Sequence, residues 1–276
     1  MTIPKIFIRK ASWKYNDLPQ ILKDIYNESL TNNPVYELKY FDDDDADNFI
    51  ETNFPQYIKY YRELIPKAYN CDIFRLLALY YYGGIYMDCA LKLLKSIKDI
   101  IHEDDELIFV KEHFNQDGIN NSFIAAKPNH PIMLEIVNYI IDNRLKVRNK
   151  GRTPLDITGP TVIGEFLKNY SKEYIRYFQF KHDFIYKPLD NIVDIYKHRK
   201  YHSNNNKSFY DNNPSVLSCN YENCYILNEH NEQIIKNKFE GYYNLVYNNH
   251  LEYHYDNLWK NNIIFSNTYN TSNWTN

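Results

Sequence analysis

The sequence predicts an α/β fold, in which a mixed sheet is flanked by helices. Short apolar runs, such as Ile3–Ile8 and Leu107–Lys111, alternate along the chain with longer stretches of helical periodicity. The 276 residues have a hydrophobic content of 44%, which is enough for one large core with helical elaborations. We therefore expect residues 1–276 to form a single domain.

The N-terminal part of the chain is predicted to form a strand, a helix and a second strand. Ile3–Ile8 is an apolar run of strand length. Asp17 suits the N-cap of a helix that extends to about Leu30, with Pro19 early in that helix. The second strand is expected at Val35–Phe41.

Four adjacent acids, Asp42–Asp45, follow the second strand. Such a group suggests a metal site, but consecutive carboxylates point in different directions. One of them is expected to cap the helix that starts near Ala46. If the cluster contacts a ligand, Asp43 and Asp44 are the better candidates.

Two predicted helices, Phe54–Leu64 and Pro66–Tyr82, lead to the most informative part of the chain. In the second helix, apolar residues recur at the i, i+3, i+4 and i+7 positions of one buried face. Asp72 and Arg75 are three residues apart, so their side chains leave the helix on roughly the same side. Taken alone, this pair also fits an ordinary surface ion pair.

A glycine turn and a short strand follow this helix. The Gly-Gly pair at 83–84 stops the helix, because glycine adopts the left-handed conformation of a C-terminal cap. Ile85–Met87 favours a strand, which places Asp88 at its carboxyl end. Because ligands of open α/β sheets collect at that end, Asp72, Arg75 and Asp88 form a candidate site.

The remaining chain is predicted to add further strands and helices. Residues 91–101 are expected to be a linker with a short helix. We expect strands at Leu107–Lys111 and Ser122–Ala126, and helices from about His130 to Asn149 and at Thr161–Lys168. Residues 170–240 contain no motif and are interpreted as a less recognisable insertion.

The composition argues against several other classes of protein. The formal net charge is -3 and no long basic run is present, so nucleic-acid binding is not expected. No stretch approaches the roughly 20 apolar residues of a membrane span, and the N-terminus is unlike a signal peptide. The four cysteines, at positions 71, 89, 219 and 224, lack the usual zinc spacing and suggest reduced thiols. We expect a cytoplasmic protein that is soluble or peripheral to a membrane.

The central string resembles the sugar-binding region of glycosyltransferases with a DXD motif. The pattern of that family is Asp-x-x-Arg, apolar residues and Tyr-Gly-Gly-Ile-Tyr-x-Asp-x-Asp. Asp72, Arg75, Tyr82–Tyr86 and Asp88 match it, but the closing Asp is replaced by Ala90. The family includes the yeast-type initiating mannosyltransferases, bacterial capsular transferases and the glucosylating clostridial toxins. The resemblance implies a GT-A-type, Rossmann-like sheet flanked by helices.

Other segments resemble the same family. The opening strand, with Trp13 behind it, resembles the strand beneath the donor nucleotide, which implies that Ile8 lies near the donor. Asn121 begins a matching run that ends in His130-Pro131, where His130 is interpreted as a packing residue. The family's Thr-Gly-Pro turn is matched at residues 158–160, and a helix N-terminus there suits a phosphate or acceptor.

A C-terminal string of the family, His-His-Trp-x-x-Ser-Trp, is matched in part. His254 and Trp259 keep its register, whereas Leu258 replaces its Ser. The resemblance implies that His254 binds a metal ion or the diphosphate and that Trp259 packs over the donor. Without the resemblance, an isolated His in a Tyr-rich stretch is more often structural.

The resemblance implies a retaining hexosyltransferase that transfers a sugar from a nucleotide-sugar donor to a glycan, glycolipid or protein acceptor. Cations must balance the charge that develops on the leaving diphosphate. Mn²⁺ or Mg²⁺ is the implied cofactor, with Asp88 and His254 as its ligands. Because Ala90 removes one ligand, Lys92 or Arg75 is an alternative source of positive charge.

The resemblance also implies the roles of the site residues. Those implied for catalysis and for orienting the sugar are Asp72, Arg75, Asp88 and Asn121. Those implied for binding the donor are Ile8, Tyr86, Asp88 and Trp259. Residues 170–240 are then expected to lie on the acceptor side.

Two other interpretations stay open at this point. A degenerate member of the fold would bind a nucleotide sugar or glycan without turnover, which Ala90 and Leu258 favour. An unrelated enzyme that hydrolyses carbohydrates or phosphates would instead use Asp42–Asp45, and its activity would survive Asp88→Ala.

Overall fold

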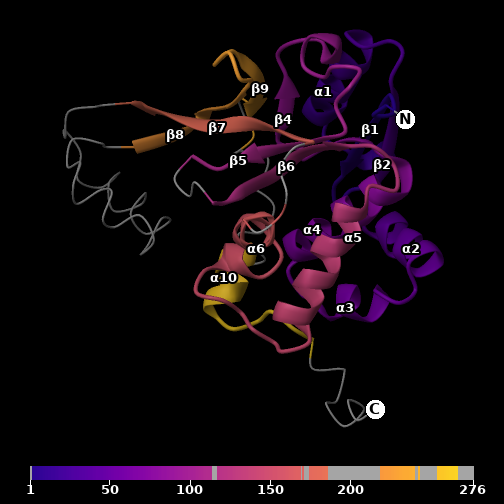
Figure 1. Ribbon diagram of the computed structural model, residues 1–276, viewed down its shortest axis with the longest axis vertical. Coiled ribbons are helices and arrows are strands. Elements are labelled where there is room, and N and C mark those ends of the chain that lie inside the picture. The colour runs from indigo at the N-terminus through magenta and orange to yellow at the C-terminus, as the bar shows by residue number, and fades with distance from the viewer. Residues whose placement is uncertain are drawn as a thin grey trace.

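The computed structural model describes residues 2–113, 117–168, 170, 174–185, 218–239, 242 and 254–266. In this part of the chain, one nine-stranded mixed sheet is flanked by helices (Figure 1). The strands are β1 (Ile6–Lys10), β2 (Glu37–Phe41), β3 (Gly84–Met87), β4 (Leu91–Leu93), β5 (Leu107–Lys111), β6 (Ile119–Ala126), β7 (Ile175–Ile185), β8 (Ser218–Leu227) and β9 (Gln233–Asn237). The α-helices are α1 (Gln20–Thr31), α2 (Asp43–Asn53), α3 (Ile58–Glu63), α4 (Lys67–Tyr82), α5 (Pro131–Ile140), α6 (Pro160–Leu167) and α10 (Tyr255–Lys260).

The strand order is β2-β1-β3-β6-β5-β7-β8-β9-β4. The pairs β1–β2, β1–β3 and β5–β7 are parallel, whereas β3–β6, β5–β6 and the pairs from β7 onward are antiparallel. This arrangement confirms the predicted fold class, a mixed α/β sheet with flanking helices. None of the described helices is long and apolar enough to cross a membrane.

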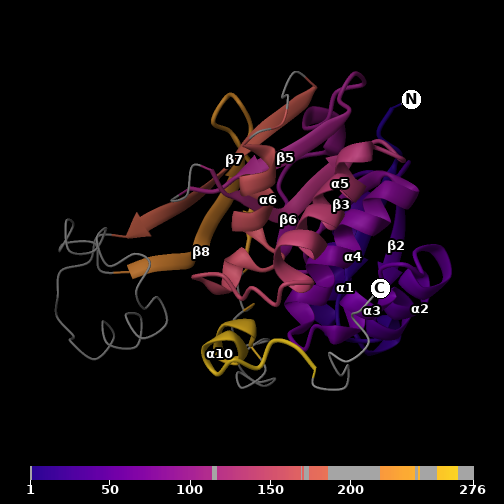
Figure 2. The same ribbon diagram turned by 60° about the horizontal axis from the view of Figure 1, so that its bottom comes forward.

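Alternating side chains of the central strands supply the cores on the two faces of the sheet. Ile8 and Tyr86 point to one face and pack with α4, α5 and α6, whereas Phe7, Ile85 and Met87 belong to a second cluster. Figures 1 and 2 show α4, α5 and α6 together on the same side of the sheet. Each fully buried aliphatic or aromatic side chain contributes roughly 1.5–3 kcal/mol to stability.

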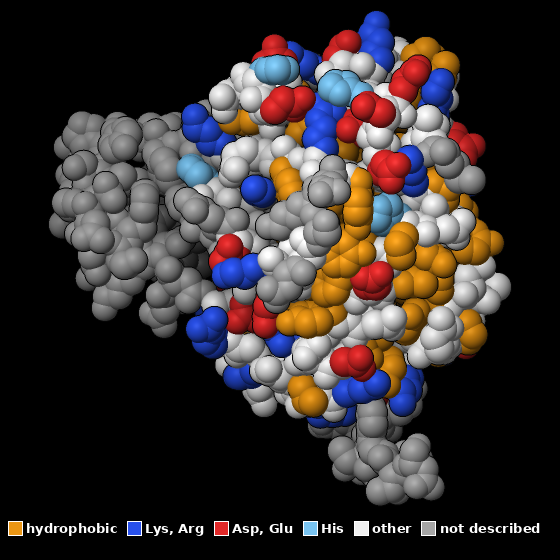
Figure 3. All heavy atoms as spheres, in the orientation of Figure 1, with side chains coloured by type: hydrophobic (Ala, Val, Ile, Leu, Met, Phe, Trp, Pro, Cys, Tyr) orange, Lys and Arg blue, Asp and Glu red, His pale blue; other side chains and the backbone are white. Residues whose placement is uncertain are grey.

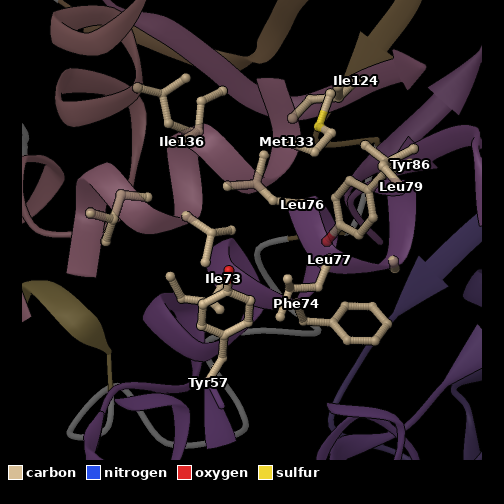
Figure 4. Close-up of a cluster of buried hydrophobic side chains, with 14 of the residues drawn as sticks. Tyr57, Ile73, Phe74, Leu76, Leu77, Leu79, Tyr86, Ile124, Met133 and Ile136 are labelled. Atoms are coloured by element: carbon tan, nitrogen blue, oxygen red, sulfur yellow. The ribbon is translucent and has the colours of Figure 1, made fainter. Parts of the chain in front are cut away.

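Helix α4 lies at the centre of the larger core. Its buried residues interdigitate with side chains of β6 and α5, as Figure 4 shows for Leu76, Ile124 and Met133. The predicted apolar face of this helix is therefore confirmed. Because the helix is buried on nearly all sides, Asp72 and Arg75 are also enclosed, at 7% and 4% exposure.

The glycine turn after α4 has the expected left-handed backbone. Gly83 and Gly84 have φ angles of 63° and 92°. A Cβ atom on Gly84 would lie 2.7 Å from the carbonyl oxygen of Ile6, so the close approach of this turn to β1 also requires glycine.

The link between β3 and β4 constrains the shape of the whole sheet. Six neighbouring steps separate the two strands in the sheet, which in a flat sheet corresponds to roughly 29 Å. The chain from Met87 to Leu91 spans at most about 15 Å. The sheet must therefore curl so that its β9–β4 edge returns close to β3.

Several boundaries differ from the sequence prediction for identifiable reasons. Pairing in β1 starts at Ile6 rather than Ile3, because Pro4 has no N–H and its carbonyl accepts the Ile6 N–H in a turn. Helix α1 begins after Pro19, and Asp17 instead ends a short 3-10 helix, η1 (Tyr15–Asp17). The helix after β2 begins at Asp43, three residues before the expected start.

The segment after β3 holds the largest errors of the prediction. Residues 91–93 form β4 instead of a linker, although the expected short helix is present as η2 (Ile97–Asp99). The predicted helix up to Asn149 is α5 followed by a π-helical turn, η3 (Ile141–Leu145). Strands β7, β8 and β9 come from the region without a motif.

Candidate active site

Asp88 follows β3 and keeps one carboxylate oxygen available. Its backbone N–H donates to the carbonyl of Ser122 at 2.8 Å, which extends the β3–β6 pairing by one residue. Its Oδ1 accepts from the Tyr86 hydroxyl at 2.7 Å and lies 3.3 Å from Nη1 of Arg75. The side chain is 33% exposed, and no described residue donates to Oδ2. A carboxylate with one oxygen fixed and the other open is suited to a ligand.

Arg75 forms ion pairs with both Asp88 and Asp72. Its Nη2 lies 2.9 Å from Oδ1 of Asp72, Nη1 donates to the carbonyl of Asn121, and the guanidinium stacks 4.7 Å from the Tyr86 ring centroid. Burial opposes the charge, but Asp88, Tyr86 and Asp72 outweigh it and hold the pKa of Arg75 above its ordinary value. Arg75 is therefore a permanent, internally paired cation.

Asp72 joins three elements. Its Oδ1 accepts from the Asn121 amide of β6 at 2.8 Å, and its Oδ2 accepts from the Thr158 hydroxyl at 2.8 Å. Thr158 lies between η4 (Pro154–Asp156) and α6 and is fully buried. Burial raises the pKa of Asp72, although Arg75 and Thr158 oppose the rise. The Thr-Gly-Pro turn thus supplies a partner for Asp72, a role that the sequence did not indicate.

These contacts bring the expected catalytic residues together but divide them into two groups. Asp88 reaches the surface, whereas Asp72, Arg75 and Asn121 are nearly enclosed and already partnered. Asp72 and Arg75 were expected to bind the sugar hydroxyls. In this structure Arg75 contacts the Asp88 carboxylate, and Asp72 in turn pairs with Arg75. Tyr86 is fully buried and acts on Asp88 through its hydroxyl, which also contacts Sγ of Cys71 at 3.0 Å.

Ile8 requires a correction. Its side chain is 0% exposed and belongs to the main core, so it offers no surface to a donor. The sequence left a plain core strand open as the alternative, and the structure agrees with that alternative. Arg9, the next residue of β1, reaches the site instead, because its Nη1 donates to the carbonyl of Asp88.

Arg9 fixes the loop that carries Asp88. Its Nη1 donates to the carbonyls of Asp88 at 2.7 Å and Leu91 at 3.1 Å, and its guanidinium lies 4.8 Å from the Tyr26 ring centroid. Burial lowers the pKa of Arg9. From the other side, the N–H of Lys238, next to β9, donates to the carbonyl of Ala90 at 2.8 Å. The loop is thus held by residues from both ends of the chain.

Two tyrosines from the C-terminal part lie near the same carboxylates. Burial raises the pKa of Tyr255, and the nearby carboxylates of Asp256, Asp72, Glu112 and Asp88 raise it further. The ring centroids of Tyr255 and Tyr69 lie 6.0 Å apart. Burial, Cys89 and Asp88 likewise raise the pKa of Tyr242. Sequence reasoning missed both, because a chain with 28 tyrosines gives no signal that singles out two of them.

His254 and Trp259 have other partners in this structure. His254 is the N-cap of α10, and its Nδ1 accepts from the N–H of Asp256 at 3.3 Å. Burial lowers the pKa of His254, which favours a neutral ring. The Trp259 indole donates to the carbonyl of Lys150 at 2.8 Å, and the Lys150 ammonium lies 5.0 Å from its ring centroid. Tyr253, which precedes His254, lies outside the described residues.

The described residues fit a divalent cation poorly. Asp88 offers one unpaired oxygen, Ala90 offers none, and no group of three candidate ligands gathers around Asp88 in the described ranges. The described candidate group is His102, Asp104 and Asp105, on the segment before β5. There, Asp105 is already ion-paired with Arg176 at 2.7 Å.

The acidic run after β2 does not converge on a metal site. Asp42 caps α2 by accepting from the N–H of Asp45, whose carboxylate in turn accepts from the N–H of Asp42. This confirms the expected capping role. Asp43 instead pairs with Lys10 and lies 3.7 Å from Lys67. Asp42, Asp43 and Asp45 thus have separate partners and do not converge on one ligand site.

A cavity of about 200 Å³ lies beside the Asp88 loop. Its lining comes from the end of β1, the start of α4, the Asp88 loop and one C-terminal tyrosine: Lys10, Ala11, Ser12, Trp13, Lys67, Ala68, Cys71, Cys89 and Tyr242. Lys92, the expected alternative cation, does not line it and pairs with Glu28 at 2.8 Å.

His130 is buried against Tyr174, in agreement with a packing role.

Comparison with known proteins shows similarity to glycosyltransferases. Residues 19–107 match the family described as "Glycosyltransferase sugar-binding region containing DXD motif". The chain is 26% identical to inositol phosphoceramide mannosyltransferase 3 of Schizosaccharomyces pombe over 135 residues, which are 49% of this chain and 36% of that protein. It is 25% identical to an uncharacterized glycosyltransferase of Acanthamoeba polyphaga mimivirus over 171 residues, which are 62% of this chain and 66% of that protein.

The matched part is therefore less than two thirds of each of these relatives. Among solved structures, the chain is similar to the PaToxG glycosyltransferase, with a TM-score of 0.45 and 19% identity over 60% of this chain and 69% of that one.

Proposed function

We propose that the protein is a retaining, nucleotide-sugar-dependent glycosyltransferase, because residues 19–107 match the glycosyltransferase sugar-binding region that contains a DXD motif. The observation that carries the proposal is the carboxylate of Asp88. It lies at the end of β3 with Oδ1 fixed by Tyr86 and Arg75 and with Oδ2 open. This arrangement supports the proposal, because a carboxylate with one oxygen fixed and the other without a described donor can accept hydrogen bonds from a donor sugar.

In the proposed reaction, Asp88 orients the donor through hydrogen bonds that its Oδ2 accepts from sugar or ribose hydroxyls. The oxygen of an acceptor hydroxyl bonds to the anomeric carbon on the face that the diphosphate leaves. The bond from that carbon to the diphosphate oxygen breaks, and the acceptor proton passes to the departing diphosphate. This scheme retains the anomeric configuration and needs no nucleophile from the protein.

Asp72, Arg75 and Asn121 are proposed as positioning residues. They lie beneath Asp88 in one chain of contacts, and each is buried and paired. A preorganised carboxylate needs no rearrangement when the donor binds, which is the way in which fixed charges contribute most to catalysis. Replacing any of them is expected to weaken the orientation of Asp88 without removing a direct contact to the substrate.

The names of the relatives suggest the sugar and the acceptor. The Schizosaccharomyces pombe relative is named as a mannosyltransferase that acts on inositol phosphoceramide. We propose mannose as the first donor sugar to test and a glycan or glycolipid hydroxyl as the acceptor. A divalent cation at Asp88 stays a prediction to be tested with EDTA, because the described residues supply few ligands for it.

The experiment is nucleotide release from UDP-, GDP- and dTDP-sugars, including GDP-mannose, with Mn²⁺ and with EDTA. Asp88→Ala is expected to reduce release by about 100-fold. Asp99→Ala, which makes the same change at an exposed position on η2, is the matched control and is expected to match the wild type. Release that is equal in the wild type and Asp88→Ala would contradict the proposal.

A degenerate, non-catalytic binder is the second candidate, because Ala90 removes one carboxylate of the motif. In that case, one nucleotide raises the thermal midpoint of the wild type but not of Asp88→Ala, while no acceptor or donor yields turnover. Transfer of sugar to any acceptor would exclude it.

A further inference from the structure

The cavity beside the Asp88 loop holds more positive than negative charge. The side chain of Lys10 is 3% exposed and its ammonium pairs with Oδ1 of Asp43, and the ammonium of Lys67 lies 3.7 Å from Oδ2 of the same carboxylate. Two cations thus share one anion. The rest of the lining is neutral: Ala11, Ser12, Trp13, Ala68, Cys71, Cys89 and Tyr242.

A buried ammonium is costly unless it is paired, so its retention at the end of a strand calls for an explanation. Asp43 offsets one of the two positive charges. Burial of Asp43 would raise its pKa, but Lys10 and Lys67 outweigh this effect and lower it. A single carboxylate between two lysines leaves capacity for a further anion. The excess charge is the feature that an anionic ligand would neutralise.

The cavity is placed to receive the part of a ligand next to Asp88. Cys89, the next residue along the chain, lines it. At about 200 Å³ the cavity is smaller than the roughly 300–1,000 Å³ of pockets for drug-sized ligands, so it suits one portion of a nucleotide sugar. If Asp88 binds the sugar, the adjoining phosphates lie close enough to enter this cavity.

Other cations of the described site are committed to internal partners. Arg75 is paired with Asp72 and Asp88, and Lys92 with Glu28. Arg9 donates to the carbonyls of Asp88 and Leu91, and burial lowers its pKa. Lys10 and Lys67 are the pair that faces an open volume.

We propose that Lys10 and Lys67 bind the diphosphate of the donor and supply the positive charge that the missing carboxylate at Ala90 would otherwise help a metal ion to supply. This inference rests on the proposed function and deepens it. Asp43 holds the two ammonium groups in place in the free protein and shares them with the diphosphate in the complex. Lysine suits this role because it binds phosphate as a compact point charge.

The test measures binding rather than turnover. Affinities for UDP, GDP and dTDP are determined by calorimetry in EDTA, together with the matching nucleosides, which lack phosphate. In Lys67→Met, the affinity for the preferred diphosphate is expected to fall about tenfold, whereas the affinity for its nucleoside is unchanged. Lys67 is 65% exposed, so this variant is not expected to disturb folding.

Three further variants sharpen the result. Lys10→Met is expected to show the same selective loss. Asp43→Asn is expected to raise diphosphate affinity several-fold, because it frees both lysines, whereas a purely structural ion pair would give no gain. Lys98→Met removes the same charge from the exposed helix η2, outside the cavity lining, and is the matched control.

The outcomes separate the inference from the proposed function. Diphosphate binding that is unchanged in both lysine variants would overturn the inference and leave the transferase proposal standing. An equal loss for diphosphate and nucleoside would also overturn it, because the cavity would then bind the base. If the wild type binds none of the diphosphates in EDTA, the inference fails, whereas nucleotide release that needs Mn²⁺ and Asp88 would leave the proposed function standing.

Discussion

Removing the carboxylate of Asp72 is expected to destabilise the fold by about 3 kcal/mol. Deleting one partner of a buried ion pair typically costs about 3–5 kcal/mol, because the remaining charge is left uncompensated. Arg75 retains Asp88 and the carbonyl of Asn121, which places the cost at the lower end. The Asn121 amide and the Thr158 hydroxyl also lose their acceptor, and each buried donor left unpaired costs roughly 1–3 kcal/mol, in part for the same rearrangement.

The assay is urea denaturation of the wild type and Asp72→Ala, with the free energy of unfolding extrapolated to water. Asp47→Ala is the control, since it also removes a carboxylate that pairs with an arginine, in this case the exposed Arg62. The control is expected to cost less than about 1 kcal/mol, as exposed ion pairs do. Asp72→Asn should fall between the two, because it keeps one acceptor without the charge.

A loss for Asp72→Ala no larger than that for Asp47→Ala would refute this reasoning. It would mean that Arg75 finds full compensation elsewhere, or that water enters to satisfy the freed donors. Either result would also weaken the case that Asp88 is held rigidly from beneath.

Three further predictions concern the turn, the tyrosine and a buried acid. Gly84→Ala is expected to cost about 1–3 kcal/mol in urea denaturation, because φ is 92° and the new Cβ would meet the Ile6 carbonyl; a neutral effect would contradict the described backbone. Tyr86→Phe is expected to cost about 1 kcal/mol of stability and to lower donor turnover, since it removes the hydrogen bond to Oδ1 of Asp88; wild-type kinetics would argue against fixation of Asp88 by Tyr86. Burial raises the pKa of Glu63 above 4.5, so the stability it contributes is present below pH 4.5 and is lost as the pH rises through its folded pKa. Glu63→Gln should therefore be more stable than the wild type at pH 7.5 but not at pH 4, and an equal difference at both pH values would contradict this assignment.

The sequence predicted those elements whose signals are local. The apolar periodicity of α4, the Gly-Gly turn and the position of Asp88 after β3 all agree with the structure. The capping role of the acidic run was also predictable, because an N-cap and its partner are three residues apart. The charge distribution follows the composition too, since Figure 3 shows basic and acidic side chains interspersed on one face of the molecule.

Contacts between distant segments could not be predicted. Thr158 meets Asp72 across 86 residues, and Arg9 meets the Asp88 carbonyl across 79. Strand β4 has only three residues and forms by pairing with β9, so no local pattern announces it. Ile8 was placed near the donor by the resemblance of its strand, but β1 lies inside the sheet with a hydrophobic cluster on each face, so this side chain is buried.

Through the short link from β3 to β4, the C-terminal part of the chain helps to position the loop that carries Asp88. The loop of residues 88–90 has to bridge the centre of the sheet and its far edge, and that edge exists because β9 pairs with β4. A fragment that ended before β8 would keep every residue of the sugar-binding match yet lose this anchor, including the bond from Lys238 to Ala90. The loop that carries Asp88 is thus held by residues from both the N-terminal and the C-terminal part of the chain.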